Sequence, residues 1–378
     1  MLPAFTIGVE EEYQIIDPQT RSLAGLSNAL IETNETSETS QAIVHELFSC
    51  EVEIATDVCH TLEEVRQALV KARQAVTTAA KKNGVAIAAA GTHPFSPWKD
   101  QKITSKERYR SLQDDLGQVV SQLIILGCHV HVGIEDREMA VQVVNRARIW
   151  LPTLLALTAN SPFLEGKDTG YDSYRMTLWS QLPTAGPPPL FQDYADYQTL
   201  IAQLIDTGIT DDPTKVYWDI RLSERFPTVE FRVSDVCTRI DEAVMLAGLL
   251  RALAHTCYQD ALHSQPFPRV RGEMLRAAMW QAARYGLHGS LIHFMTMKSL
   301  PAKTLVTALL DYVQPALEHY GDWSFVSQQV SDILTHGNGA ERQRKTYEAT
   351  RSYKAVADGM TLPCCNKYAT SVEPAVTL

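Results

Sequence analysis

The sequence predicts an α+β fold in which one antiparallel sheet packs on helices and the last third of the chain is helical. Four short segments alternate aliphatic with charged residues, as strands do when one face is buried. Segments with apolar residues every three or four positions stand between these strands and fill the C-terminal third. Strands mixed with helices, followed by a run of helices, are typical of the α+β class.

The first predicted strand covers residues 5–16 and contains three consecutive glutamates. Successive side chains of a strand point to opposite faces, so Glu10 and Glu12 share one face while Glu11 shares the other with Tyr13. Two carboxylates on one strand face repel each other unless a positive group lies between them. Exposure to water at a sheet edge would relieve this repulsion and is the ordinary explanation for a single pair of this kind. Here, however, the pattern recurs in other strands.

The same two-faced pattern returns in three later strands. They carry Glu51 and Glu53 in residues 50–56, His129 and His131 in 127–134, and Glu230 and Arg232 in 228–234. A solvated face would include Lys, whereas the charged positions of these four faces are Glu, His and Arg. Carboxylates with one or two imidazoles are typical of a divalent-cation site, and oxygen-rich ligation favours Mg²⁺ or Mn²⁺ over Zn²⁺. The sequence therefore predicts an acidic, imidazole-bearing site on one face of the sheet.

Local signals place the elements around the second strand. The polar stretch 32–40 is expected to be a mobile loop. Thr61 and Glu64 form a capping box that begins a helix, which a basic last turn and Gly84 end. The short apolar run 85–90 predicts a buried strand.

Helices dominate the rest of the chain. Apolar periodicity predicts helices at 137–158, with a kink at Pro152, and at 240–263. Between them, the three prolines of 186–189 exclude regular structure and indicate a rigid loop. The last third is expected to contain helices at 272–283, 302–318, 324–335 and 340–356, with a helix break at 337–339.

The composition narrows the class of protein. The 378 residues are 45% hydrophobic, which suffices for a sizeable core, and the net charge of −10 argues against nucleic acid as a main partner. Seven cysteines without a CxxC pair predict neither a disulfide framework nor a zinc ribbon, and Cys364 and Cys365 are expected to be free thiols. No apolar stretch of 18 residues occurs. We expect a soluble, cytoplasmic protein with no membrane partner, and one domain over residues 1–378.

Several blocks of the sequence together resemble a known family. They are residues 8–12 (GVEEE), 54–59 (IATDVC), 91–95 (GTHPF), 127–133 (GCHVHVG), 218–221 (WDIR), 229–233 (VEFRV) and 284–287 (RYGL). In this order they resemble the type 2 glutamate–cysteine ligases, the bacterial carboxylate–amine ligases, over essentially the whole chain. The strand motifs are also similar to those of glutamine synthetase. That resemblance implies a curved, antiparallel, six-stranded catalytic sheet flanked by helices.

The resemblance also implies a chemistry and its cofactors. In these families ATP phosphorylates a carboxylate, and an amine attacks the acyl phosphate to give an amide or peptide bond. Such phosphoryl transfer needs positioning and charge neutralisation, which divalent ions and an arginine supply. ATP and Mg²⁺, or Mn²⁺, are therefore the expected cofactors. The expected substrates are small amino acids, with glutamate activated at its γ-carboxylate and cysteine as the amine.

The family pattern assigns roles to individual residues. The implied metal ligands are Glu10, Glu12, Glu53, His129 and Glu230, with Glu46 as a further candidate. Glu46 stands where family members tend to have Asp. Arg232 would lie against the transferred phosphate, and His131 would contact substrate or nucleotide rather than metal.

Further candidates would bind the substrates. Arg175 and Arg221 are predicted to hold carboxylates or phosphates through paired hydrogen bonds, although each alone is equally compatible with a structural ion pair. The other candidates lie on a loop at a strand end and near a helix N-terminus; they are Thr92, His93, Arg342 and Gln343. The tryptophans Trp179, Trp218 and Trp280 are expected to be core residues.

Two other functions remain open on the sequence. His129 and His131 on one strand are also compatible with a zinc hydrolase, although the dominance of carboxylates and the nearby arginine favour the ligase. A nucleotide-binding protein without turnover is the other alternative. Ser49, where some relatives have an acid, would be consistent with weaker activity or another substrate. The apolar helix at 240–263 leaves room for a homodimer.

Overall fold

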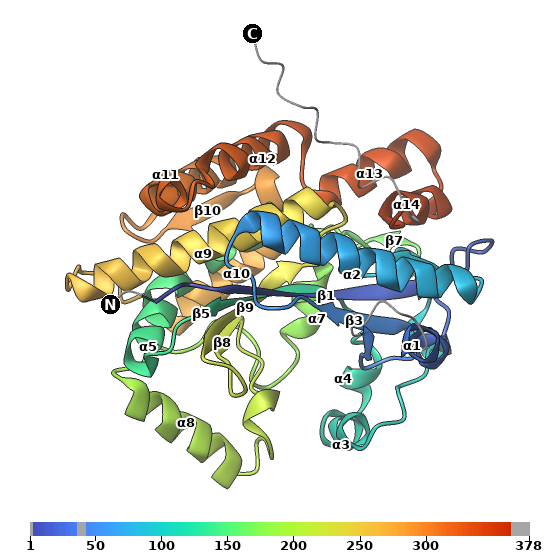
Figure 1. Cartoon of the computed structure of the whole chain (residues 1–378), viewed down its shortest axis with the longest axis horizontal. Coiled ribbons are helices and arrows are strands. Elements are labelled where there is room, and N and C mark those ends of the chain that lie inside the picture. Colours follow the sequence, from blue (N-terminus) through green and yellow to red (C-terminus); the bar gives the residue numbers. More distant parts are fainter. Residues whose placement is uncertain (1–2, 36–42, 364–378) are drawn as a thin grey trace.

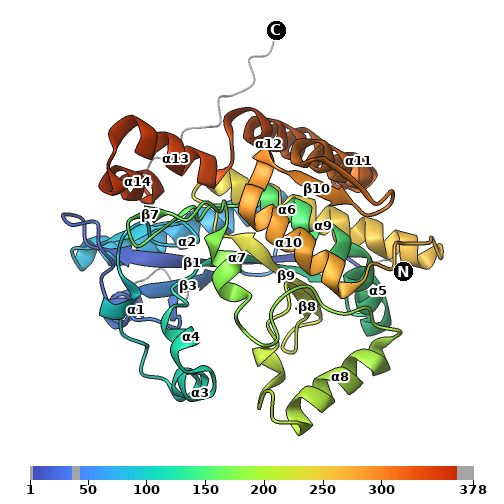
Figure 2. The same ribbon diagram turned by 180° about the vertical axis from the view of Figure 1, so that it is seen from behind.

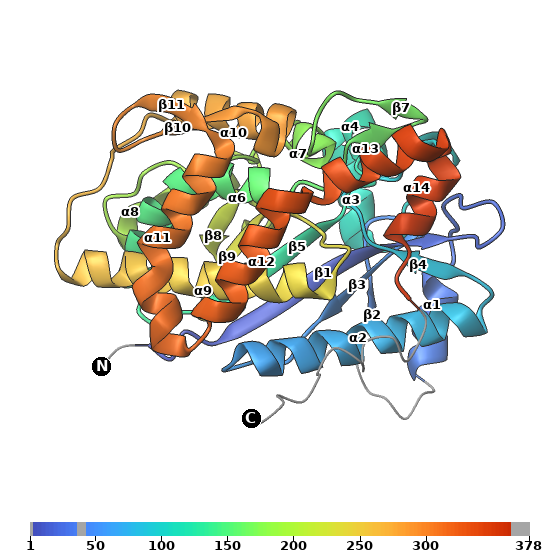
Figure 3. The ribbon, with the colours of Figure 1, turned by 90° about the horizontal axis from the view of Figure 1, so that it is seen from above.

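The computed structural model describes residues 3–35 and 43–363. Within these residues a central sheet has seven strands in the order β2–β3–β1–β5–β9–β8, with β4 paired to β1 (Figures 1 and 3). Every pairing in this sheet is antiparallel. The strands are β1 (Ile7–Ile16), β2 (Ile43–His45), β3 (Glu51–Ala55), β4 (Ala86–Ala88), β5 (Gly127–Gly133), β8 (Ile220–Leu222) and β9 (Thr228–Asp235). The predicted α+β class is confirmed, and the four predicted two-faced strands are β1, β3, β5 and β9.

One face of the sheet is packed on long helices. The helices α2 (Leu62–Lys82) and α9 (Ile240–Leu262) cover this face (Figures 1 and 3). Thr61 caps α2 by accepting a hydrogen bond from the Glu64 N–H, as the capping box predicts. The aliphatic side chains of the strands point at these helices and form the main core.

The opposite face carries shorter elements. Viewed from behind, α3 (Glu107–Leu116), α4 (Gln118–Ser121), α7 (Tyr174–Trp179) and α8 (Tyr194–Asp206) lie on the far side of the sheet from α2 (Figure 2). A smaller apolar cluster joins α3, α4 and α7 to the segment that follows β2. Except for Glu11, which faces the helices, the Glu, His and Arg side chains of β1, β3, β5, β8 and β9 face this side of the sheet.

The C-terminal third is helical, as predicted. It consists of α10 (Gly272–Tyr285), α11 (Ala302–Tyr320), α12 (Trp323–His336), α13 (Gly339–Thr350) and α14 (Tyr353–Met360). The expected single helix over 340–356 is wrong, because Arg351 ends α13 with a left-handed backbone (φ 53°) and Ser352 then caps α14. Two hairpins, β6–β7 (Phe163–Leu164 with Lys167–Asp168) and β10–β11 (Ser290–His293 with Lys298–Pro301), complete the fold.

Two other expectations need correction. The helix expected at 137–158 is divided into α5 (Arg137–Ala147) and α6 (Leu151–Thr158) by a 3₁₀ turn, and Pro152 lies in the first turn of α6, where a missing N–H is tolerated. Residues 32–35 of the expected loop belong to α1 (Ser27–Glu35). Residues 36–40 of that loop, and Cys364 and Cys365, lie outside the described residues. In the described part of the chain, no helix is long and apolar enough to cross a membrane.

Candidate active site

A cavity of about 530 Å³ lies on the charged face of the sheet. Its floor comes from β1, β3, β5, β8 and β9, and its walls come from the segment after β2, from α3 and α7, and from residues 214–226. The strand alternation that buries aliphatic side chains under α2 and α9 turns the acidic and imidazole side chains into this cavity. The predicted gathering of the four strands' charged faces therefore occurs in one place.

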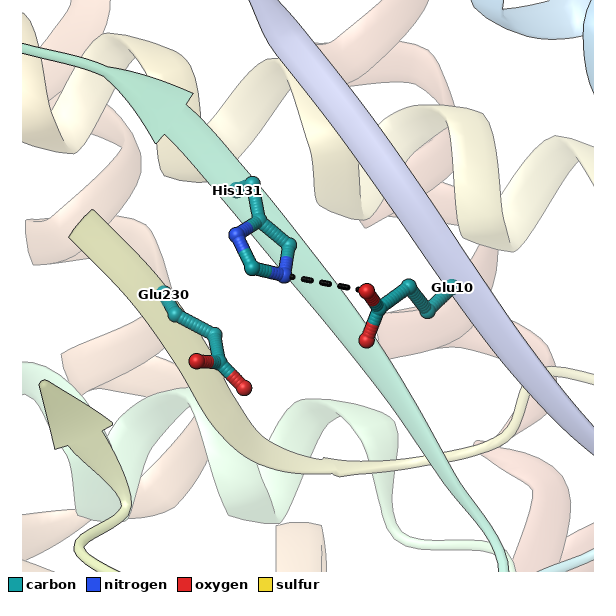
Figure 4. Close-up of side chains that lie close together, drawn as sticks. All are labelled: Glu10, His131 and Glu230. Atoms are coloured by element: carbon teal, nitrogen blue, oxygen red, sulfur yellow. Dashed lines mark ion pairs between the residues drawn. The ribbon is translucent and has the colours of Figure 1, made fainter. Parts of the chain in front are cut away.

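Three neighbouring strands contribute the first group of donors. Glu10 of β1, His131 of β5 and Glu230 of β9 have donor atoms that all lie within 4.8 Å of one another. Figure 4 shows the three side chains converging from adjacent strands, with His131 Nε2 3.3 Å from Glu10 Oε1. His131 is directly opposite Glu230 in the ladder. Although burial raises it, hydrogen bonds from His129 and His131 hold the pKa of Glu10 well below its usual value.

The second group consists of carboxylates only. Glu12 lies opposite Glu53 on β1 and β3, and Glu46 follows β2; their oxygens also lie within 4.8 Å of one another. Burial, with the charges of Glu46, Glu10 and Glu12, raises the pKa of Glu53 well above its usual value. Burial likewise raises the pKa values of Glu12 and Glu46. One buried and two half-buried carboxylates at this distance are a chemically suitable oxygen cage for a divalent cation, which would relieve their mutual repulsion.

His129 lies between the two groups. Its Nδ1 is 3.4 Å from Glu10 Oε2 and its Nε2 is 3.8 Å from Glu12 Oε1. The family resemblance implied that His129 is a metal ligand and that His131 is a substrate contact, whereas the geometry groups His131 with Glu10 and Glu230. The Nε2 atoms of both imidazoles are buried and face carboxylate oxygens, that of His131 at 3.3 Å from Glu10 and that of His129 at 3.8 Å from Glu12, so either could bind a cation held by these carboxylates.

Arginines neutralise part of this acidic floor. Arg232 Nη1 donates to Glu230, and Arg221 Nε donates to the same carboxylate over 2.8 Å. Burial raises the pKa of Glu230, but the charges of these two arginines prevail and hold it below its usual value. Arg221 also donates to the Thr214 and Val216 carbonyls over 2.8 Å, which fixes its guanidinium in place.

Arg175 and Trp179 come from α7 and complete this wall. Arg175 is 1% exposed, and its Nη2 donates to the Arg232 carbonyl over 3.3 Å. The Trp179 ring centroid is 5.7 Å from Arg175 Cζ and 5.4 Å from Arg232 Cζ, so both guanidinium groups lie over one aromatic ring. Trp179 was expected to be a core residue, but it lines the cavity.

Four of the predicted substrate-binding residues lie outside this cavity. Thr92 donates to the Phe163 carbonyl over 2.8 Å, and His93 Nε2 bonds to the Arg21 carbonyl over 2.9 Å beside a separate cavity of about 180 Å³.

The remaining two of the four are held by contacts near the start of α13. Arg342 pairs with Glu242 of α9 at 2.7 Å, and Gln343 donates to Asn160. The contacts of all four residues hold loops and helices together. A position at a strand end or at a helix start could not distinguish this structural role from substrate binding.

Several cavity residues were given no role from the sequence. Glu51 is fully buried, lines the cavity and has one carboxyl oxygen without a partner among the described residues. The alternation of β3 placed it beside Glu53, so the signal for it was present in the sequence. Lys106, Arg108 and Arg225 bring positive charge to the cavity from segments without regular alternation, and nothing in the sequence pattern indicated them.

Comparisons with known proteins agree with this architecture. The family model of glutamate–cysteine ligase family 2 matches residues 6–360. A relative from Rhodopirellula baltica, named "Putative glutamate–cysteine ligase 2", is 42% identical over 344 residues, which are 90% of this chain and 92% of that protein. A relative of the same name from Herpetosiphon aurantiacus is 39% identical over 354 residues, covering 94% and 91%.

Two solved structures share the fold. The glutamate–cysteine ligase of Francisella tularensis, solved in complex with AMP, gives a TM-score of 0.70 at 14% identity and covers 94% of this chain and 87% of that one. A bifunctional glutathione synthetase from Pasteurella multocida gives 0.68 at 12% identity, covering 94% and 50%.

Fold, site and relatives define an enzyme that forms carbon–nitrogen bonds by joining a carboxylate to an amine. The chain belongs to glutamate–cysteine ligase family 2. The family resemblance read from the sequence motifs is thereby confirmed.

Proposed function

We propose that the protein is an ATP- and Mg²⁺-dependent ligase that couples the γ-carboxylate of glutamate to the amine of cysteine. ATP would phosphorylate the carboxylate, the amine would displace phosphate from the acyl phosphate, and ADP, phosphate and γ-glutamylcysteine would be released. The relatives' names and the AMP-bound structural relative support ATP and these two amino acids. The family membership supports the reaction class.

The observation that carries the proposal is one cavity with two groups of cation donors and an arginine between acidic side chains. We assign Glu10, His131 and Glu230 to one divalent cation and Glu12, Glu46 and Glu53 to another. Bound cations would neutralise phosphate charge in this cavity. Arg232, with Arg175 beside it, is suited to hold the transferred phosphate, because a guanidinium offers parallel hydrogen bonds to two oxygens.

The three basic side chains that the sequence did not predict extend this assignment. Lys106, Arg108 and Arg225 line the same cavity, where they would attract the carboxylate and phosphate groups of incoming substrates.

The test is ADP formation by the purified protein with ATP and Mg²⁺, across a panel of carboxylates crossed with amines. The panel includes glutamate and cysteine, and each substrate is also supplied alone. ADP formation that needs both partners supports the ligase and identifies its substrates. ADP formation with another pair would keep the reaction and replace the substrates. No ADP formation with any pair, from a protein that binds zinc stoichiometrically, would favour hydrolysis instead.

A further inference from the structure

Asp219 is a buried acid beside the cavity. No hydrogen bond among the described residues compensates for the burial of its carboxyl group. It lies directly before β8 and is 1% exposed, and neither of its carboxyl oxygens has a hydrogen-bond partner among the described residues. A buried carboxyl group without a partner is costly, and native proteins contain few of them. Asp219 therefore points to a second arrangement of the site in which a partner is present.

The ladder between β8 and β9 identifies that partner. Arg221 lies opposite Glu230, and the Arg232 N–H donates to the Asp219 carbonyl over 2.8 Å, so Asp219 lies opposite Arg232. Residues 219 and 221 share a face of β8, and side chains directly opposite each other across a ladder are within contact distance. Two acids and two arginines thus alternate on this part of the sheet.

Only one of these two cross-strand charge pairs is formed in the described structure. Arg221 binds Glu230 directly, whereas Arg232 turns along its own strand and also binds Glu230. Arg232 Nε has no hydrogen-bond partner among the described residues, which leaves donor capacity unused beside an unused carboxyl group. Burial raises the pKa of Asp219 to about 7, against the charges of Arg175 and Arg232, so the group can be charged near neutral pH.

We propose that Asp219 is a positioning residue that takes Arg232 over from Glu230 when the Glu10–His131–Glu230 group binds a divalent cation. The inference rests on the proposed function in assigning a cation to Glu230. A cation and Arg232 compete for the same carboxylate oxygens, so cation binding releases the guanidinium. Asp219 then binds the released guanidinium and keeps it against the anionic groups of the substrate.

The test compares Asp219→Asn with Asp322→Asn. Asp322 is an acid that forms an ion pair with Arg251 of α9. It precedes α12, on the helix-covered side of the sheet and away from the cavity (Figure 1). Without divalent cations, Asp219→Asn should melt at or above the wild-type temperature, because it loses an unpartnered acid. Asp322→Asn should melt lower. Calorimetric titration with Mg²⁺ should show an affinity about tenfold or more weaker for Asp219→Asn, as for other residues that support metal ligands.

Trp179 provides a spectroscopic readout of Arg232, whose Cζ is 5.4 Å from the ring centroid. Mg²⁺ should change the emission of Trp179 in the wild type and in Asp322→Asn, and this change should be lost in Asp219→Asn. A Trp179→Phe variant identifies the contribution of this tryptophan.

Three outcomes would overturn the inference. They are an unchanged Mg²⁺ affinity and emission response in Asp219→Asn, a lower melting temperature of this variant without cations, and a wild type that does not bind Mg²⁺. ADP formation by the wild type decides the proposed function separately. Mg²⁺ binding that depends on Asp219 in a protein that forms no ADP would sustain the inference and refute the ligase.

Discussion

Glu11 of β1 and Arg73 of α2 form a two-point ion pair on the helix-covered face of the sheet, and both side chains are fully buried. The Tyr13 hydroxyl also donates to Glu11, and Arg73 donates to the Cys237 and Thr238 carbonyls over 2.9 Å. The middle residue of the three consecutive glutamates therefore joins the sheet to α2, while its two neighbours face the cavity.

Glu11→Gln should destabilise the fold strongly, because it leaves the Arg73 charge buried without its partner. Breaking one side of a buried pair costs about 3–5 kcal/mol in the free energy of unfolding. Urea unfolding measures the loss. The double variant Glu11→Leu/Arg73→Met removes both charges and should lose less than Glu11→Gln; an equal or larger loss would contradict this account of the pair.

Glu53→Gln should have the opposite effect on stability. Burial and three nearby carboxylates raise the pKa of Glu53, so removing its charge relieves repulsion in the absence of metal. The melting temperature without divalent cations should rise or stay level, while Mg²⁺-dependent stabilisation and ADP formation should be lost. A large fall in the metal-free melting temperature would instead identify Glu53 as a structural residue.

Asp219 should make the stability of the metal-free protein depend on pH. Its pKa of about 7 in the folded state exceeds the unfolded value of about 3.9. Between about pH 4 and 7 the folded state holds a proton that the unfolded state has released, so this group lowers the free energy of unfolding as pH rises.

Asp219→Asn removes that contribution. Relative to the wild type, the variant should gain stability as pH rises through this window, by up to about 1.4 kcal/mol per pH unit. Urea unfolding at several pH values tests this expectation. A difference between variant and wild type that is constant from pH 4.5 to pH 8, about the usable range, would count against it.

Much of the sheet and its acidic face could be predicted because strand alternation is a local property. Glu10, Glu12, Glu53, His129, His131 and Glu230 reach the cavity as their positions along each strand require. The predicted α9 and the first helices of the C-terminal third follow from periodicity in the same way.

The grouping of ligands could not be predicted, because it depends on how strands are registered. The β5–β9 ladder shifts between Cys128 and Val130, so one residue of β5, His129, faces two residues of β9, Arg232 and Val233. After this bulge Glu230 lies opposite His131, and His129 is left closer to β1. The roles of Arg342 and Gln343 were equally out of reach, since their partners Glu242 and Asn160 are distant in sequence.

Arg232→Lys tests the phosphate-binding role. One ammonium cannot reproduce the planar fork of a guanidinium, so we expect turnover to fall by about 100-fold while ATP still binds. Steady-state kinetics give kcat, and calorimetry gives the affinity for ATP with Mg²⁺. If ATP affinity falls as far as kcat, Arg232 holds the nucleotide in the ground state, and the assignment to the transferred phosphate fails.

Gly127→Ala tests whether Arg175 must stay where it is. A Cβ at Gly127 would lie 2.4 Å from Arg175 Nη2 and 3.1 Å from His129 Nε2, so the guanidinium has to move away from the floor of the cavity. Because the flexible Arg175 side chain can move aside, the free energy of unfolding should change little. A displacement of a catalytic group by about 1 Å can nevertheless reduce turnover by about 100-fold.

Gly8→Ala is the matched control on the neighbouring strand, since its Cβ would meet His131 Cβ at an ordinary 3.6 Å. We expect near-normal ADP formation from Gly8→Ala and impaired ADP formation from Gly127→Ala, at similar melting temperatures. Equal activity of the two variants would show that the position of Arg175 does not matter for the reaction.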